Sequence, residues 1–236
     1  MRVAKLGGLT VRLTGGVDGS GGGDGPLVVL LHGFGAPADD LVPLGEVLGA
    51  PPGTRFAFPG APGALPPMWG PGRAWWMIDP TRFDRVGRGD IDGLADEVPP
   101  ELGAARDAVV AMLDELEGEL GAPAESTVLG GFSQGAMLAC DVALRTGRPI
   151  AGLVLLSTTF LCRPEWKRLL PGRTALRVFQ SHGTQDPLLP FSLASELRDA
   201  MNAAGIPVDF VEFRGGHEIP PPVVAGASAF LGRVVG

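Results

Sequence analysis

Cysteine and basic residues are scarce in this sequence, and each scarcity narrows the class of protein. Only two of the 236 residues are cysteines, too few to cross-link a small secreted scaffold and without the spacing of a metal site. We expect Cys140 and Cys162 to be buried small apolar side chains, and we expect no metal. The 19 lysines and arginines form no cluster and are outnumbered by 26 acidic residues, which argues against a nucleic-acid partner.

Long apolar runs are also missing. No segment is long and apolar enough to cross a bilayer, and the N-terminal residues lack the continuous apolar stretch of a signal peptide. We therefore expect a cytoplasmic protein without stable membrane insertion. A hydrophobic fraction of 45% over 236 residues is enough for one domain, residues 1–236, with a substantial core. The oligomeric state is left open.

Short apolar runs alternate with longer amphipathic segments along most of the chain. Runs that suit strands covered on both faces occupy residues 27–31, 55–58, 127–129, 153–156, 176–179 and 208–213. Helical segments are expected at residues 40–48, 98–120, 134–145, 191–204 and 221–234. This alternation predicts an α/β fold with a mostly parallel central sheet and helices on both faces.

The N-terminal region has a different pattern. Residues 9–14 alternate between apolar and polar side chains, and two glycines precede them, which predicts an antiparallel N-terminal hairpin. Residues 15–25 are rich in Gly, Asp and Ser and are expected to form a flexible surface connection. The segment at residues 98–120 should expose an acidic face.

The sequence Gly-Phe-Ser-Gln-Gly at residues 131–135 places Ser133 between an expected strand and an expected helix. A strand that turns sharply into a helix strains the serine backbone, and side chains two residues away on either side would collide. Gly131 and Gly135 remove those side chains. The turn would present the hydroxyl at the positive end of a helix, so we interpret Ser133 as a catalytic nucleophile rather than a plain turn residue.

A serine hydroxyl is a poor nucleophile at neutral pH and needs a base. The sequence has three histidines, His32, His182 and His217. In strand-turn-helix hydrolases the base follows both the nucleophile and the acid along the chain, which selects His217. We interpret His32 as a structural residue that holds its turn through a local hydrogen bond.

The third catalytic group should be an acid in a loop after a strand, where it can accept a hydrogen bond from the imidazole. Asp186 fits this requirement, although an aspartate here could also simply stabilise a turn. Other carboxylates are less suitable because they fall in expected helices, in a strand or directly beside the histidine: Asp141, Asp199, Asp209 and Glu218.

The negative oxygen of a tetrahedral intermediate needs preorganised N–H donors. One should be the backbone N–H of the residue after the nucleophile, Gln134. The second should come from the turn after the strand at residues 27–31, where we predict the N–H of Phe34. The glycines on either side of Phe34 would let the backbone approach a substrate closely.

Together these motifs resemble those of the carboxylesterase/phospholipase family of small α/β-hydrolases, which includes the acyl-protein thioesterases. The matching pieces are residues 31–35, 131–135, 182–190 and 216–217. The resemblance implies the α/β-hydrolase fold and cofactor-free action on a small-molecule ester or acyl substrate. It also implies Ser133, Asp186 and His217 as the catalytic triad and the amides of Phe34 and Gln134 as oxyanion donors.

Several large apolar residues fall in loops expected at the same sheet edge, where they could line an acyl pocket or merely cover the core. The candidates are Trp69, Trp75, Trp76, Phe160 and Leu188, with Met68 and Leu161 beside them. The two neighbouring tryptophans, in Pro-rich surroundings, depart from the family pattern and leave the substrate preference open.

The leading hypothesis is a serine carboxylic-ester hydrolase that forms an acyl-enzyme from an oxygen ester or a thioester. An acyltransferase with the same serine is one alternative, distinguished by whether water or another acceptor removes the acyl group. A ligand-binding protein that keeps the fold without turnover is the other, and the intact set of Ser, Asp and His argues against it.

Overall fold

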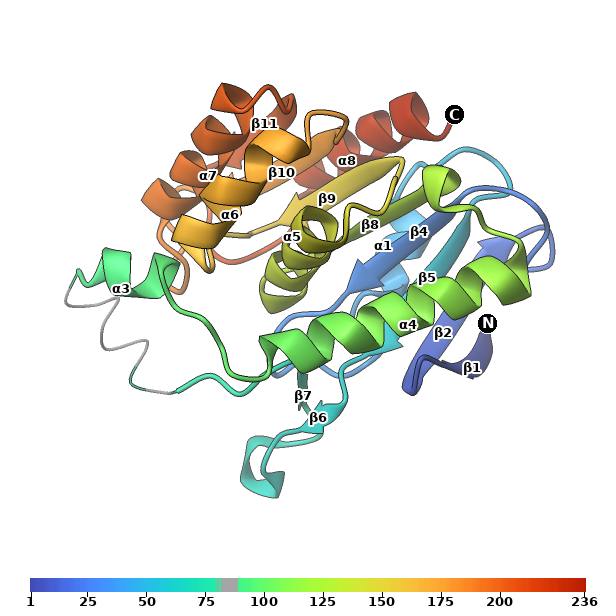
Figure 1. Ribbon diagram of the computed structural model, residues 1–236. Helices are drawn as coiled ribbons and strands as arrows, with labels where there is room; N and C mark the ends of the chain where they lie inside the picture. Colours follow the sequence, from blue (N-terminus) through green and yellow to red (C-terminus); the bar gives the residue numbers. More distant parts are fainter. Residues whose placement is uncertain (80, 82–88) are drawn as a thin grey trace.

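A mostly parallel β-sheet forms the centre of the structure (Figure 1), a computed structural model that describes residues 1–79, 81 and 89–236. Within these residues the main sheet has nine strands in the order β1, β2, β5, β4, β8, β9, β10 and β11, with β3 beside β2. The strands are β1 (Arg2–Leu6), β2 (Leu9–Gly16), β3 (Ser20–Gly22), β4 (Leu27–Leu31), β5 (Arg55–Gly60), β8 (Thr127–Phe132), β9 (Gly152–Leu156), β10 (Val178–Gly183) and β11 (Val208–Phe213).

The N-terminal hairpin is antiparallel, as predicted, and β2 also pairs antiparallel with β5. From β5 onward the pairings β4–β5, β4–β8, β8–β9, β9–β10 and β10–β11 are all parallel. Parallel strands end at the same edge of a sheet, so the loops that follow them gather on one side of the molecule. A separate two-stranded sheet consists of β6 (Gly63–Ala64) and β7 (Arg73–Ala74).

Helices cover both faces of the main sheet (Figure 1). One face carries α4 (Leu102–Leu120), α5 (Gln134–Thr146), α6 (Arg163–Leu169) and α7 (Phe191–Ala203), and the other carries α1 (Val42–Val47) and α8 (Pro221–Val234). Shorter helical segments are α3 (Ile91–Ala95), η1 (Pro67–Trp69), η2 (Ala124–Ser126) and η3 (Leu170–Gly172). Within the described residues, no helix is both long enough and apolar enough to cross a membrane.

The continuous apolar sequence of β4 follows from this layered arrangement. Leu27, Val29 and Leu31 pack into the core beneath α4 and α5, whereas Val28 and Leu30 pack beneath α1 and α8. Successive side chains of a strand point to opposite faces, so a strand covered on both sides needs apolar residues throughout. The fold is therefore the α/β class that the sequence predicted.

Two regions differ in detail from the predicted elements. The prediction of a flexible connection at residues 15–25 was wrong, because β3 pairs with β2 and Asp18 organises the turn between them. The carboxylate of Asp18 accepts hydrogen bonds from the hydroxyl and N–H of Ser20 and from the N–H of Gly22. The strand expected at residues 176–179 begins at Val178 and continues to Gly183.

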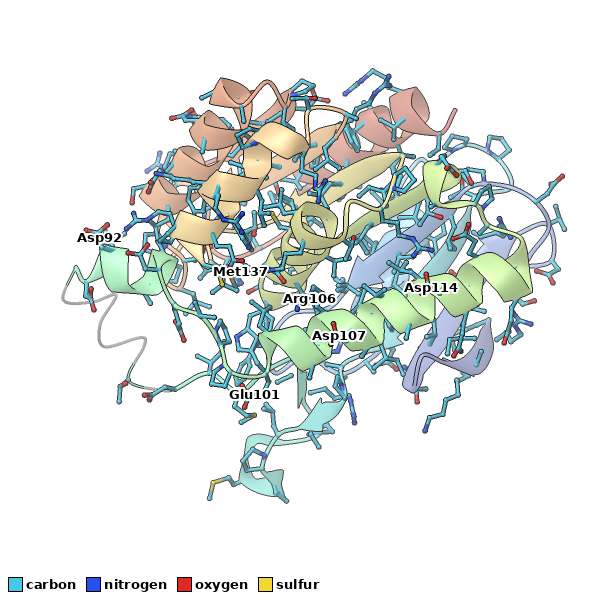
Figure 2. The ribbon with its side chains drawn as sticks, in the orientation of Figure 1. Asp92, Glu101, Arg106, Asp107, Asp114 and Met137 are labelled. Carbon is cyan, nitrogen blue, oxygen red and sulfur yellow. The ribbon has the colours of Figure 1, made fainter. Side chains whose placement is uncertain are left out.

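Helix α4 exposes the acidic face that its sequence predicts. Asp107 and Asp114 are exposed on this helix, as Figure 2 shows, whereas Val109, Leu113 and the other buried residues of α4 pack toward the sheet. The predicted burial of both cysteines is also confirmed, since Cys140 and Cys162 are free and buried.

Candidate active site

The loops after β4, β8, β10 and β11 meet at the carboxyl edge of the sheet. They carry, in that order, Phe34, Ser133, Asp186 and His217. These strands are parallel, and only β9 intervenes between β8 and β10. The topology therefore brings together residues that are about 180 positions apart in the chain.

Ser133 occupies a sharp turn between β8 and α5. Its backbone has φ 56° and ψ −119°, a conformation that non-glycine residues rarely adopt, and it is the N-cap residue of α5. A Cβ on Gly135 would lie 2.0 Å from the carbonyl oxygen of Leu31, and one on Gly131 would lie 2.6 Å from the backbone of Gly135. The two glycines are thus needed for close packing of the turn, which stores backbone strain at the serine.

His217 and Asp186 form a direct hydrogen bond across the sheet edge. Nδ1 of His217 lies 2.7 Å from Oδ2 of Asp186, and the aspartate side chain is fully buried. Oδ1 of Asp186 accepts the N–H groups of Leu188 and Leu189 at 2.9 Å and 3.0 Å. Burial alone would raise the pKa of Asp186, but these hydrogen bonds, led by the one from His217, lower the pKa overall. The aspartate is therefore held ionised and oriented toward Nδ1.

A second histidine contacts the same carboxylate. Nε2 of His182 lies 2.9 Å from the carbonyl oxygen of Leu189 and 3.3 Å from Oδ2 of Asp186, and the His182 side chain is fully buried. Because a carbonyl oxygen only accepts, Nε2 must carry the hydrogen. Burial lowers the pKa of His182, so the ring is neutral. From the sequence alone, His182 was considered only as the catalytic base and was rejected in favour of His217.

An apolar cavity of about 140 Å³ opens at Ser133. Ser133 and His217 both border it, as does Phe34. The ring of Phe132 packs against the imidazole of His217 with centroids 4.7 Å apart, which limits the ring's movement. The nucleophile and base predicted from the sequence therefore face one common space.

The backbone and the side chain of Gln134 have different roles. Its backbone N–H is in the first turn of α5, where N–H groups have no partner within the helix. Its buried side chain accepts the N–H of Trp75 at 3.0 Å and donates to the carbonyl oxygen of Trp76 at 2.8 Å. The amide therefore fixes the segment containing the two tryptophans beside the serine turn.

His32 has the local structural role expected for it. Its Nδ1 lies 2.8 Å from the carbonyl oxygen of Gly33, and its Nε2 accepts the N–H of Ala61 at 3.0 Å. The indole N–H of Trp75 donates to the carbonyl oxygen of His32. Burial lowers the pKa of this imidazole, so it serves as a neutral brace of the loop after β4.

Most of the predicted acyl-pocket residues do not border the cavity at Ser133. Leu188 borders the cavity at Ser133, but Trp75, Trp76 and Phe160 do not. The two tryptophans are buried where the Gln134 amide holds their backbone, and they border a separate groove beside α4. Phe160 is fully buried and packs near the ring of Trp166. The side chain of Trp69 lies outside the described part of the structure.

Several residues that border the cavity were given no pocket role by the sequence analysis, among them Asp40, Ile78, Met137 and Leu189. Met137 could have been found, because a residue four positions after Ser133 lies on the same side of the helix that starts there. Leu189 lies close to Asp186 in the sequence. Asp40 and Ile78 come from loops whose paths the sequence does not reveal.

The strained serine at a strand-helix turn, facing a histidine that is hydrogen-bonded to a buried aspartate, defines the serine hydrolases of the α/β-hydrolase class. The profile of the Phospholipase/Carboxylesterase family matches residues 20–235. The chain belongs to this family, and it is a serine ester hydrolase that acts on small-molecule ester or acyl substrates.

Individual relatives and structures agree with this assignment. Acyl-protein thioesterase 1 of Mycosarcoma maydis is 29% identical over 223 residues, which cover 87% of this chain and 89% of the relative. The crystal structure of esterase PE8 has a TM-score of 0.77 and 26% identity, and covers 96% of this chain and 99% of that one. Acyl-protein thioesterase 2 of Zea mays, at 22% identity and a TM-score of 0.73 over 96% of this chain and 99% of its own, shares the fold.

Proposed function

We propose that the protein hydrolyses carboxylic esters through an acyl-enzyme on Ser133. The observation that carries this proposal is that Ser133 and His217 border one cavity while Nδ1 of His217 lies 2.7 Å from Asp186. That hydrogen bond orients the ring so that Nε2 is the nitrogen available to the serine. Asp186 then stabilises the positive imidazolium that forms when the ring takes up a proton.

In the acylation step, Nε2 of His217 removes the hydroxyl proton while Oγ of Ser133 attacks the carbonyl carbon. The tetrahedral intermediate collapses as the imidazolium gives this proton to the leaving alcohol or thiol. In the second step His217 takes a proton from water, and the hydroxide adds to the acyl carbon. Collapse releases the carboxylic acid and returns the proton to Ser133.

The negative oxygen of each intermediate would be stabilised by the N–H groups of Gln134 and Phe34. The first belongs to the opening turn of α5, where the helix dipole adds positive potential. The second belongs to a loop that borders the same cavity. Loss of one such donor typically costs about 10²–10³ in kcat.

The size of the cavity favours a short acyl group. Its volume of about 140 Å³ is close to that of an apolar cavity of about 150 Å³ that holds benzene. The apolar side chains that line it are those of Phe34, Ala36, Ile78, Phe132, Met137, Leu188 and Leu189. We therefore propose acyl groups of a few carbons, or an aryl group, as the preferred acyl part.

A chain-length series of p-nitrophenyl esters tests this proposal, with kcat/KM as the measure because it reports differential transition-state binding. We expect kcat/KM to be highest for short acyl chains and to fall by about tenfold or more for long ones. A matching series of acyl thioesters shows whether oxygen or sulfur leaving groups are preferred. We include thioesters because relatives of this chain are named thioesterases. A kcat/KM that rises continuously to palmitate would contradict the short-chain preference.

A cytoplasmic location and the lack of a nucleic-acid partner are among the expectations that stay predictions. For the ester hydrolase itself, the remaining prediction is that water, rather than another acceptor, removes the acyl group from Ser133. It can be tested by adding alcohol acceptors during turnover and measuring the ratio of transfer product to free acid.

A further inference from the structure

A second cavity, of about 380 Å³, lies apart from Ser133 at the β1–β2 edge of the main sheet. Lys5, Arg12 and Arg73 border it, and we refer to it as the basic cavity. The whole chain has 26 acidic and 19 basic residues, whereas all three charged residues that border the basic cavity are cationic. No residue of the basic cavity borders the cavity at Ser133.

The strand register explains why these side chains meet. Lys5 of β1 is paired with Thr10 of β2, and Thr10 is paired in turn with Gly60 of β5. Arg12 is two residues beyond Thr10 and therefore points to the same face, opposite to the buried Val11. Arg73 comes from the separate β6–β7 sheet. Main-chain pairing thus fixes the backbone positions of two of the three basic residues, Lys5 and Arg12.

The guanidinium of Arg12 has an unused donor. Its Nη1 is buried from solvent and has no hydrogen-bond partner among the residues that the structure describes. Among the described residues, the ion-pair partner of Arg12 is Asp39, whose side chain is 57% exposed. Nη2 of Arg12 lies 3.9 Å from Oδ2 of Asp39. That distance is beyond a hydrogen bond. A buried charged N–H without an acceptor costs free energy, so a negatively charged oxygen bound at this position would be stabilising.

Arg73 is held in place by the protein itself. Its Nε donates to the carbonyl oxygen of Ala61, and its Nη2 donates to that of Pro62 at 2.9 Å. These neutral acceptors fix the guanidinium without cancelling its charge. Arg73 therefore contributes a fixed positive charge to the cavity wall, which lowers the entropy lost when an anion binds.

We propose that the basic cavity is a binding site for a phosphate monoester. Guanidinium groups match the oxygens of a phosphate through paired N–H donors, and the ammonium of Lys5 adds a mobile point charge. A volume of about 380 Å³ lies within the range of small-molecule sites, roughly 300–1,000 Å³, so it leaves room for an organic group beside the phosphate. The phosphate could belong to a soluble metabolite or to a lipid headgroup.

Calorimetric titration of the full chain with inorganic phosphate and with glycerol 3-phosphate, at neutral pH and constant ionic strength, tests the site. We expect saturable one-to-one binding of both probes that Arg12→Gln weakens by about tenfold. Lys5→Gln should weaken it less, and Lys5 is exposed, so this variant keeps the test valid if Arg12→Gln folds poorly. Arg2→Gln, on the same strand but outside the cavity, is the matched control and should bind as the unaltered protein does.

Co-sedimentation with phosphatidylcholine vesicles, with and without phosphatidic acid, identifies the source of the phosphate. Binding of the soluble probes without sedimentation identifies a soluble ligand. Sedimentation that depends on phosphatidic acid and is lost in Arg12→Gln identifies a headgroup. Either result supports the site. The proposal is overturned if neither probe nor vesicle binds saturably, or if binding is the same in Arg12→Gln, Lys5→Gln and Arg2→Gln.

Discussion

Nε2 of His182 lies 3.3 Å from Oδ2 of Asp186, the oxygen that accepts the hydrogen bond from His217. The same Nε2 hydrogen points to the carbonyl oxygen of Leu189 at 2.9 Å, while the N–H of Leu189 donates to the other oxygen of Asp186. His182 therefore restrains the aspartate directly and also through the loop that carries it. We infer that His182 positions Asp186 without contacting the substrate.

His182→Phe keeps a buried ring but removes the N–H donor. We expect kcat/KM to fall by about tenfold, because Asp186 loses part of its restraint and stabilises the imidazolium less well. The pH at which kcat/KM falls on the acid side should also change, which loss of folded protein alone would not cause. Ser181→Ala, a buried neighbour on β10, is the control and should keep the wild-type pH profile. A pH profile of kcat/KM in His182→Phe that is identical to the wild-type profile would show that His182 does not position Asp186.

Stability should decrease as the solution becomes mildly acidic. Burial lowers the pKa of both His32 and His182 in the folded protein, whereas an unfolded histidine has a pKa of about 6.5. Below about pH 6.5 the unfolded chain therefore binds protons that the folded chain does not, and each histidine removes up to about 1.4 kcal/mol of stability per pH unit. The lowered pKa of Asp186 adds a loss only at much lower pH, below about 3.9.

Urea unfolding between neutral pH and about pH 5, in the range where unfolded histidine titrates, measures this effect. The free energy of unfolding of His182→Phe should depend less steeply on pH than that of the unaltered protein, because one of the two buried imidazoles is gone. Equal slopes for the two proteins would show that His182 is not kept neutral by the fold.

Gln134→Leu tests the link between the serine turn and the tryptophan segment. The substitution leaves the N–H of Trp75 and the carbonyl oxygen of Trp76 buried without their partner. We expect the free energy of unfolding to fall by about 2–6 kcal/mol, since each of the two unsatisfied buried groups costs about 1–3 kcal/mol. Gln185→Leu, which changes an exposed glutamine in the same way, should stay within about 0.5 kcal/mol. Equal effects of the two substitutions would contradict this account.

Met137→Ala should enlarge the cavity at Ser133, because Met137 borders it and is otherwise buried. We expect the preferred acyl chain to become longer, with kcat/KM for a medium-chain ester rising relative to that for a short-chain ester. Met112→Ala removes the same side chain from the core beneath α4 and is the control for lost stability. It should leave the ratio of the two kcat/KM values unchanged. If Met137→Ala leaves the chain-length preference unchanged, the acyl group does not occupy the cavity beside Met137.

The sequence predicted the parts of this structure that depend on local pattern. The runs at β4, β8 and β9 lack charged residues within their buried stretches because helices cover both faces of the sheet. Ser133 could be found because the turn requires a glycine on either side. The order of the motifs then selected His217, and the position in a loop after a strand selected Asp186; the structure places Nδ1 of His217 2.7 Å from Oδ2 of Asp186.

What the sequence could not predict depends on contacts between distant segments. Trp75 and Trp76 looked like pocket residues, but the buried amide of Gln134, about 60 positions away, holds their segment in the core. The pairing of β3 depends on how Asp18 closes its turn. The contact between His182 and Asp186 depends on the path of one loop, and the hydrophobic pattern of the sequence does not reveal that path.

Covalent labelling of Ser133 tests the central claim most directly. A fluorophosphonate probe should add once to the folded protein, as measured by intact mass, and peptide mapping should place the adduct on Oγ of Ser133. The folded Ser133→Ala variant should acquire no adduct and should lose esterase activity. An adduct on another residue, or labelling and turnover that persist in Ser133→Ala, would contradict the account.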